Sequence, residues 1–256
     1  MTFNASLHAH ADHPIAAPLS EVNTDRLLRR AVRGRARPRL LDLGCGQGVW
    51  LHRALTAFPR ARAAGVDIDG RALALARAEA EALGVTDRLT LHETPAAEFR
   101  TGEGGDEPYD VVLCVGATHA FGGLLPTLEA ARRHLAPGGV AVVGEGFWER
   151  EPDAATLDGL GATRDEFGDL PGTVARVTEA GWAPVHGHTS TLEEWDEYEW
   201  SWTGSLTRWA LDHPEDPHSA EALRRAAAHR DGWLNGYRGT LGFVTLVLRP
   251  VPSPAG

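Results

Sequence analysis

The chain has 256 residues, of which 43% are hydrophobic, so it is long enough to bury a sizeable core within one large domain. Its formal net charge is −10, which argues against a nucleic-acid partner, because such partners favour a basic surface. The sequence has no apolar run that would span a membrane and no signal-peptide pattern, so we expect a cytoplasmic protein without a membrane partner.

The first half of the chain alternates predicted strands and helices. Residues 1–19 read as irregular, and a helix is expected from Ser20 to about Val32. The strands expected next are Leu40–Leu43, Ala63–Ile68, Leu89–His92, Asp110–Val115 and, after a turn at Pro137–Gly139, Val140–Gly144. The helices between them are expected at about Gly48–Phe58, Arg71–Leu83 and Leu124–His134. This alternation predicts an α/β fold, a mostly parallel sheet with helices on both faces.

The second half adds two strands and a helical insertion. A helix at Thr173–Ala180 precedes a strand at Ala183–His188, and Thr240–Leu248 reads as the last strand. Between these strands, helices are expected at about 192–211 and 217–235. We therefore predict a single domain over 1–256, with an N-terminal lid segment and helix over 1–34 and a helical cap inserted at 192–236, before the last strand.

The clearest sign of a ligand site is a strand that runs directly into closely spaced glycines. Leu40–Leu43 is followed by Gly44-Cys45-Gly46-Gln47-Gly48, and glycine lets a backbone approach a ligand closely. About twenty residues later, the second strand ends at Asp67, in a place suited to accepting the hydroxyls of a ribose. The spacing differs from the G-x-G-x-x-G of dinucleotide sites, which is suited to a pyrophosphate.

The segments LDLGCGQG, GVDID, YDVVLCVGATHAFGG and LAPGGVAVVGEG span about residues 38–146. In content, order and spacing they resemble the motifs of the class I S-adenosylmethionine (SAM)-dependent methyltransferases. The resemblance implies a Rossmann-like, seven-stranded sheet and SAM as cofactor. SAM carries an ammonium and a sulfonium but no phosphate, so Asp42 beside the glycines suits it. ATHAFGG, GEGFWERE and the insertion further resemble a bacterial subgroup that includes the YjhP-like proteins, a resemblance that implies no particular substrate. We expect this chain to act on a small molecule.

The resemblance also implies residue roles on the cofactor. The glycine-rich turn would surround the methionine and ribose parts of SAM through Gly44, Cys45, Gly46 and Gly48. Asp42 would face the amino group, Asp67 would bind the ribose hydroxyls, and Ile68 would cover one face of the adenine.

The remaining cofactor contacts are expected after the third and fourth strands. Ala96 and Ala97 would meet the adenine edge, and Val115 would complete the site at the end of the fourth strand. The family commonly has an aspartate after the third strand, whose carboxylate accepts from the adenine amino group. The aligned position here holds Pro95, which has no carboxylate to make this contact.

The catalytic candidates are His119 and Glu145, which follow the fourth and fifth predicted strands. An imidazole titrates near neutral pH and suits a general base, and a carboxylate at a strand end is placed to face a pocket. Each residue also has a structural interpretation, as a loop histidine and as a hydrogen-bonded carboxylate. We expect both to line one cavity with the SAM methyl group.

The acceptor candidates lie mostly in the insertion. Trp195, Tyr198 and Trp202 begin an aromatic stripe at helical spacing, which Glu199 borders, whereas Glu193, Glu194, Asp196 and Glu197 are expected to face solvent. The stripe is either a docking face or a cap over the acceptor, for which aromatic rings and a carboxylate favour an amine or a flat ring. Trp148 and His13 are the other candidates for substrate contacts. No metal site is expected, since His8, His10 and His13 do not have diagnostic spacing.

Three functions therefore remain open. The first is methyl transfer to N, O, S or C of a small molecule; the second is another SAM chemistry, such as cyclisation of SAM; the third is a non-catalytic SAM-binding module. A dinucleotide oxidoreductase fits less well because of the glycine spacing. The oligomeric state is open, with a homodimer among the alternatives.

Overall fold

A computed structural model of the chain describes residues 5–101 and 107–252. Residues 1–4 of the predicted N-terminal segment lie outside the described residues. The chain divides into two compact units. The sheet unit comprises Glu21–Glu145, Val174–His188 and Val244–Gly256, and the helical unit comprises Met1–Ser20, Gly146–Thr173 and Thr189–Phe243. The N-terminal segment and the helix that follows it thus fall in different units.

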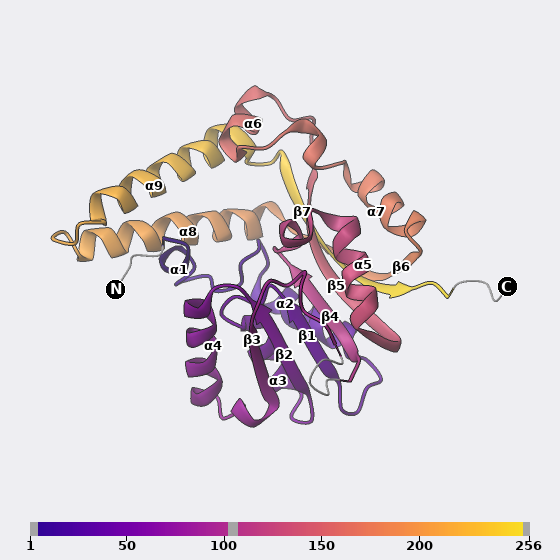
Figure 1. The fold of residues 1–256 in the computed structure, drawn as a ribbon. Helices are drawn as coiled ribbons and strands as arrows, with labels where there is room; N and C mark the ends of the chain where they lie inside the picture. The colour runs from indigo at the N-terminus through magenta and orange to yellow at the C-terminus, as the bar shows by residue number, and fades with distance from the viewer. Residues whose placement is uncertain (1–4, 102–106, 253–256) are drawn as a thin grey trace. The chain divides into compact units, whose positions relative to one another are not determined.

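The sheet has seven strands in the order β3-β2-β1-β4-β5-β7-β6 and is mixed but mostly parallel (Figure 1). The strands are β1 (Arg39–Leu43), β2 (Arg62–Asp67), β3 (Leu89–Glu93), β4 (Tyr109–Val115), β5 (Leu135–Trp148), β6 (Trp182–Thr189) and β7 (Leu241–Pro250). The ladders that join β3, β2, β1, β4 and β5 are all parallel. This order confirms the predicted fold class. The strand order runs outward in opposite directions from β1 and β4. The topological switch point therefore lies between these two strands, and such sheets bind ligands at that point.

The helices that accompany the first strands begin and end within two residues of the predicted positions. They are α2 (Glu21–Ala31), α3 (Val49–Ala57), α4 (Gly70–Ala82) and α5 (Leu124–His134). Helices α3 and α4 pack against β1, β2 and β3, and α5 packs against β4. The later helix α7 (Leu170–Glu179) begins three residues before the predicted start. Two 3₁₀ turns, Thr86–Arg88 and Thr118–Phe121, complete this part of the chain.

Strand β5 is much longer than the predicted Val140–Gly144. Tyr109 pairs with Leu135 and Val111 with Val140, so the whole of Ala136–Gly139 lies opposite Asp110. The predicted turn is therefore an irregularity within the strand, where Gly138 takes a φ of 74°. At its other end β5 continues to Trp148. Glu145 was predicted to follow the strand, but it lies inside it.

The helical unit is built on two long helices, α8 (Leu192–Asp212) and α9 (Ser219–Gly232), which lie side by side (Figure 1). Their contact buries Leu206 and Ala210 of α8 against Ala222 and Ala226 of α9, and the alanines let the two backbones approach closely. The predicted helices are confirmed here, although the second ends earlier, in a π-helical turn at Trp233–Tyr237. The prediction that residues 1–19 are irregular is wrong for Ala5–Ala9, which form helix α1, and α6 (Ala154–Leu160) was not predicted.

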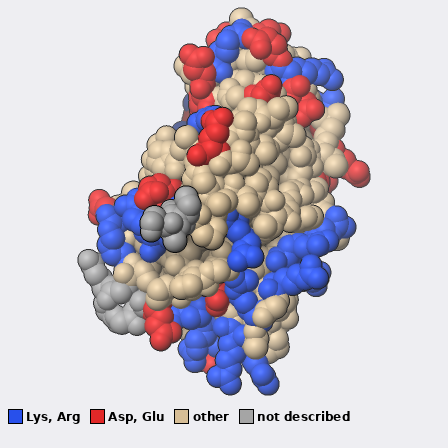
Figure 2. Space-filling model, turned by 90° about the vertical axis from the view of Figure 1, so that its right-hand side faces the viewer, with Lys and Arg blue, Asp and Glu red and all other residues tan. Residues whose placement is uncertain are grey.

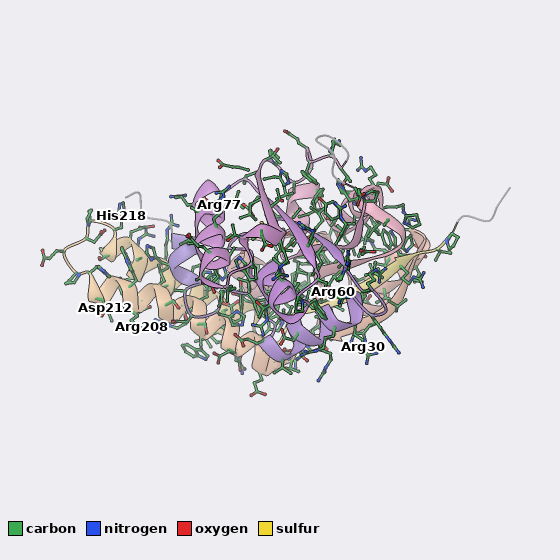
Figure 3. All side chains as sticks on the ribbon, turned by 90° about the horizontal axis from the view of Figure 1, so that it is seen from below. Arg30, Arg60, Arg77, Arg208, Asp212 and His218 are labelled. Atoms are coloured by element: carbon green, nitrogen blue, oxygen red, sulfur yellow. The ribbon has the colours of Figure 1, made fainter. Side chains whose placement is uncertain are left out.

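The N-terminal segment is fastened to α8 within the helical unit. The ring of His8 stacks on Trp209 at 4.7 Å, and the carboxylate of Asp12 accepts hydrogen bonds from Ser205 and Arg208. Figure 3 shows Arg208 on the same helix, near the turn that leads to α9. These contacts explain why a segment without a hydrophobic repeat takes a defined path.

Helix α8 begins with a capping box, which the sequence analysis did not identify because it considered only the aromatic pattern of this helix. The hydroxyl of Thr191 accepts from the backbone N–H of Glu194, whose carboxylate accepts from the backbone N–H groups of Thr191 (3.0 Å) and Ser20 (2.8 Å). Glu194 is buried, so its predicted exposure to solvent is wrong. The cost of burying this carboxylate is offset by its hydrogen bonds to two backbone N–H groups, one of which is distant in the sequence.

The charged side chains are unevenly distributed over the surface. On the face drawn in Figure 2, basic side chains predominate in the lower part, despite the net charge of −10, whereas acidic and basic side chains are mixed near the top. Among residues 5–101 and 107–252, no helix has both the length and the apolar character required to cross a lipid bilayer.

The first prediction concerns Glu194. Replacing Glu194 with Ala leaves two N–H groups without their acceptor and should lower the free energy of unfolding by about 1–3 kcal/mol. Glu193, exposed on the same turn, supplies the matched control, and Glu193→Ala should change stability by less than about 0.5 kcal/mol. Urea unfolding of both variants measures the difference, and equal midpoints would contradict the capping role.

Candidate active site

The glycine-rich turn between β1 and α3 takes a backbone path that only glycine adopts readily. Gly44, Gly46 and Gly48 have φ values of 86°, 51° and 74°. A Cβ on Gly44 would lie 2.5 Å from the Cβ of Ala117, whereas a Cβ on Gly46 would meet nothing within 4 Å. Packing therefore excludes a side chain at Gly44, while the backbone at Gly46 faces open space that a ligand is able to fill.

Asp67, the last residue of β2, holds this turn in place. One carboxylate oxygen accepts from the backbone N–H of Gly46 at 2.8 Å, and the other accepts from the N–H of Asp69 at 2.9 Å. Each oxygen keeps a second lone pair for a further donor. Ile68 follows directly and has 71% of its surface exposed, so its apolar side chain is accessible to a ligand. A ribose at Asp67 and a flat base at Ile68 fit this pair.

Asp42 is a buried acid within β1, 3% exposed. Burial, and then the charge of Asp67, raise the pKa of Asp42 to about 7. A carboxyl group in this state is half protonated near neutral pH, and a cation placed beside it would favour the charged form. The site is thus suited to an ammonium group, in agreement with the role that the resemblance implies.

The two cysteines are buried and free. Burial raises the pKa of the Cys45 thiol and of the Cys114 thiol, with the charge of Asp42 adding to both. Both therefore stay protonated and are poor nucleophiles. Cys45 lies in the turn, where its Sγ is 3.8 Å from the carbonyl oxygen of Gly46, so it contributes packing and backbone.

Ala96 and Ala97, the predicted adenine-edge residues, line a cavity of about 210 Å³ after β3. Phe121 and His134 line it from the side of α5. Burial, then the charges of Arg133 and Arg100, lower the pKa of His134 to about 4, so its ring is neutral and bonds to Thr101 at 2.6 Å. Val115 is buried at the end of β4.

The catalytic candidates lie in different local settings. His119 is exposed in the 3₁₀ turn after β4, and Glu145 is half-buried in β5, one residue beyond the last ladder pair, Val115 with Gly144. Neither lines the cavity after β3. That the two share a cavity with the SAM methyl group remains a prediction.

Trp148, predicted as a substrate contact, lies in the helical unit with its hydrogen-bonding group engaged. Its indole N–H donates to the carbonyl oxygen of Arg164 at 2.9 Å, and its ring meets the edge of Phe167 at 5.2 Å. Only 7% of the residue is exposed. These contacts account for a buried tryptophan by packing alone.

The other acceptor candidates come together on α8. The rings of Trp195 and Tyr198 are half-buried, and His13 meets the edge of Tyr198 at 5.4 Å. The fully buried face is displaced from the predicted stripe and runs through Glu199, Thr203, Leu206 and Ala210.

Glu199 has two partners that were absent from the sequence analysis. Its carboxylate accepts from Nε2 of His229 at 2.6 Å and from the hydroxyl of Tyr237 at 2.8 Å. Both partners lie 30 or more residues further along the chain, beyond the reach of any local pattern.

Comparison with known proteins supports the interpretation of the glycine turn. Residues 41–141 match the family model described as a methyltransferase domain. The chain is 32% identical to the uncharacterized protein YjhP of Escherichia coli strain K12 over 219 residues, which covers 83% of this chain and 84% of that protein.

Two solved structures cover nearly the whole fold. A SAM-dependent methyltransferase from Geobacter sulfurreducens, in complex with S-adenosyl-L-homocysteine, has a TM-score of 0.87 and 27% identity and covers 97% of this chain and 98% of that one. Its counterpart from Thiobacillus denitrificans, with the same ligand, has a TM-score of 0.86 and 28% identity over 98% and 100% of the two chains. The chain therefore belongs to the class I SAM-dependent methyltransferases of the YjhP-like type, and its cofactor is SAM.

Proposed function

We propose that this methyltransferase acts on a small-molecule acceptor. The observation that carries the cofactor half of the proposal is the hydrogen bond from the backbone N–H of Gly46 to Asp67, beside open space at Gly46 and with the buried acid Asp42 close enough to Asp67 to feel its charge. The net charge of −10 favours a small acceptor over a nucleic acid. The aromatic rings of Trp195 and Tyr198 on α8 favour a flat ring as the acceptor. Glu199, which had suggested an amine, is 2% exposed and already accepts from His229 and Tyr237, so it gives no support to an amine.

The chain's own residues have distinct roles in this proposal. SAM supplies an activated methyl group, so the protein's task is to hold it, align the acceptor and exclude water. The turn Gly44–Gly48 offers backbone to the methionine and ribose parts, Asp67 accepts from the ribose, and Asp42 balances the amino group. Ile68 covers one adenine face, while Ala96 and Ala97 meet its edge.

The direct test is an untargeted assay. We expect incubation of the protein with SAM and a metabolite extract to yield a product heavier by one methylene group, detected by mass spectrometry. With the acceptor identified, His119→Ala and Glu145→Gln should lower turnover by about a hundred- to ten-thousandfold and leave the affinity for S-adenosyl-L-homocysteine nearly intact. Labelled methyl groups recovered only in protein or nucleic acid would contradict the small-molecule proposal, and wild-type turnover in both variants would place the acceptor elsewhere.

A second prediction concerns Asp67. Asp67→Ala removes the acceptor for the ribose and also the support of Gly46, so binding of S-adenosyl-L-homocysteine should weaken by about 2–4 kcal/mol in calorimetry. Asp87→Ala, at a side chain 79% exposed, is the control and should bind like wild type. Unchanged affinity in Asp67→Ala would mean that the ribose lies elsewhere.

A third prediction separates stability from binding at Asp42. Because its pKa is raised from 3.8 to about 7, the stability it contributes below pH 3.8 is lost as the pH rises through about 7. Asp42→Asn removes this loss, so the ligand-free variant should be more stable than wild type at pH 8 by about 2–4 kcal/mol.

The same substitution should weaken cofactor binding. Wild-type affinity for S-adenosyl-L-homocysteine should rise between about pH 5.5 and 7.5 as Asp42 ionises, whereas Asp42→Asn should show weaker binding with little pH dependence over that range. Urea unfolding and calorimetry at several pH values measure the two effects. A variant that is destabilised at pH 8, or that binds as wild type does, would refute this role for Asp42.

A further inference from the structure

Glu199 is the feature of the helical unit that packing does not explain. It lies in the middle of α8, is 2% exposed, and occupies a position of the buried face that Leu206 and Ala210 continue. Burying a carboxylate costs several kcal/mol unless hydrogen bonds compensate. Here two donors compensate, His229 at 2.6 Å and Tyr237 at 2.8 Å. An apolar residue would serve α8 packing more simply, so the three side chains together suggest a chemical role.

The hydrogen bonds set the orientation of the His229 ring. Burial, then the charge of Glu199, raise the pKa of Tyr237, which therefore remains a hydroxyl that donates. Nε2 of His229 lies 2.6 Å from Glu199 and 3.2 Å from the Tyr237 oxygen, so Nε2 carries the hydrogen that Glu199 accepts. In that tautomer Nδ1 is a hydrogen-bond acceptor, and within the part of the chain that the structure describes no protein hydrogen bond is made to it.

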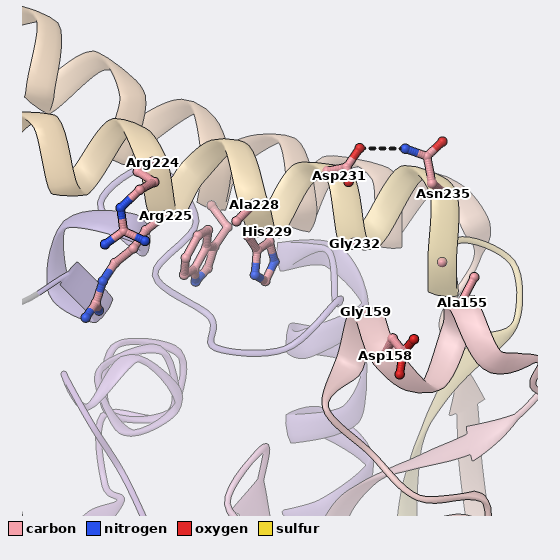
Figure 4. A pocket seen from close by; sticks show the side chains of 12 residues that line it. Ala155, Asp158, Gly159, Arg224, Arg225, Ala228, His229, Asp231, Gly232 and Asn235 are labelled. Carbon is pink, nitrogen blue, oxygen red and sulfur yellow. Dashed lines mark hydrogen bonds between the residues drawn. The ribbon is translucent and has the colours of Figure 1, made fainter.

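His229 lines an open pocket of about 730 Å³ in the helical unit, within the size range of small-molecule sites. Its ring stacks on Trp202 at 4.0 Å and 19°, so the two rings form an aromatic wall (Figure 4). Figure 4 also shows Arg224 and Arg225 on one side of His229 and Asp158 on the other.

The charges that line the pocket offset one another, which favours an uncharged ligand. Its two arginines, Arg224 and Arg225, both pair with Glu221, and two aspartates, Asp158 and Asp231, also line it. Burial lowers the pKa of His10, which interacts with Glu199 and His229, so its ring stays neutral and does not oppose a new charge on His229.

The pocket has a firm frame because α6 and α9 meet backbone to backbone. A Cβ on Gly159 would lie 2.7 Å from the carbonyl oxygen of Gly232, and a Cβ on Gly236 would lie 2.8 Å from that of Ala155. No side chain fits between the helices at these points. The π-helical turn that follows α9 includes Tyr237, whose hydroxyl reaches Glu199. The wall is thus preorganised around the acceptor nitrogen.

We propose that Glu199, His229 and Tyr237 form a proton-accepting site for a planar, uncharged ligand that carries an acidic O–H or N–H on its ring. The ligand packs against the wall of Trp202 and His229 and donates to Nδ1 of His229. When the proton transfers, the O–H or N–H bond of the ligand breaks, an N–H bond forms at Nδ1, and the electron pair stays on the ligand. The resulting imidazolium is stabilised by Glu199, while Tyr237 continues to donate to that carboxylate.

A deprotonated O or N is a good nucleophile for methyl transfer. Taking this ligand as the methyl acceptor rests on the proposed function, whereas the proton-accepting site itself does not. On that assignment the acceptor class is phenols, enols and ring N–H groups, and His229, positioned by Glu199, accepts the proton in place of His119 or Glu145.

The test uses 4-nitrophenol, which absorbs visible light only as its phenolate. Added to the full-length protein at a pH below its own pKa and without SAM, it should show a saturable rise in phenolate absorbance. His229→Phe keeps a ring against Trp202 but removes the acceptor nitrogen, so binding should weaken about ten- to a hundredfold. Glu199→Gln should retain binding but reduce the phenolate signal. His213→Phe is the matched control, because His213 also stacks on a tryptophan of α8, Trp209, and lies outside the pocket, so it should behave as wild type.

Further arms distinguish the possible failures. 4-Nitroanisole, which lacks the O–H, should bind wild type and His229→Phe equally, and His229→Gln replaces the Phe variant if circular dichroism shows that it is unfolded. Absence of a saturable phenolate signal in wild type, or an equal signal in His229→Phe, overturns the site. S-Adenosyl-L-homocysteine affinity, measured by calorimetry, tests the cofactor half of the proposed function independently. Formation of 4-nitroanisole from 4-nitrophenol and SAM supports the assignment of the acceptor, and binding without methylation overturns that assignment alone.

Discussion

The hydrogen bond from the backbone N–H of Gly46 to Asp67 is the interaction on which the cofactor site depends. It joins the turn after β1 to the end of β2, while the N–H groups of Gly44 and Cys45 both donate to the carbonyl oxygen of Val66. The three bonds hold the turn in a left-handed path that would otherwise fluctuate. A single carboxylate thus orders the backbone proposed to face the cofactor and keeps lone pairs for a further donor, so binding there would require little further ordering.

Three buried carboxylates show how differently the fold accommodates charge. Glu194 is satisfied by backbone N–H groups at the start of α8, which is a structural use. Glu199 is satisfied by the side chains of His229 and Tyr237. Asp42 lies close enough to Asp67 for that charge to raise its pKa further. The first arrangement needs no ligand. The second holds the ring of His229, which lines a pocket, and the third leaves a carboxyl group that a cation would stabilise.

The sequence predicted the sheet well because short-range patterns carry the information. Apolar strands such as Leu40–Leu43 and the glycine turn after them are local, and their positions agree with the structure within one or two residues. The irregularity in β5 was misread as a turn, because Pro137 and Gly138 are typical of both features and only the pairing of Tyr109 with Leu135 distinguishes them. Glu194 was misread because its second donor, the N–H of Ser20, is 174 residues away in the sequence.

The contrast between local patterns and contacts distant in sequence also explains which part of the function the sequence predicts. The proposed cofactor contacts are made largely by backbone, and backbone geometry requires glycine at defined spacing, so this part of the site leaves a pattern in the sequence. The proposed acceptor site is made by side chains from α8, α9 and the π-helical turn, and nothing in Ala226–Arg230 distinguishes His229 from an exposed helical histidine. Substitution at Trp202 or Asp158 would alter this pocket without touching Gly44–Gly48 or Asp67. Acceptor specificity is therefore free to diverge among relatives that keep the same cofactor turn.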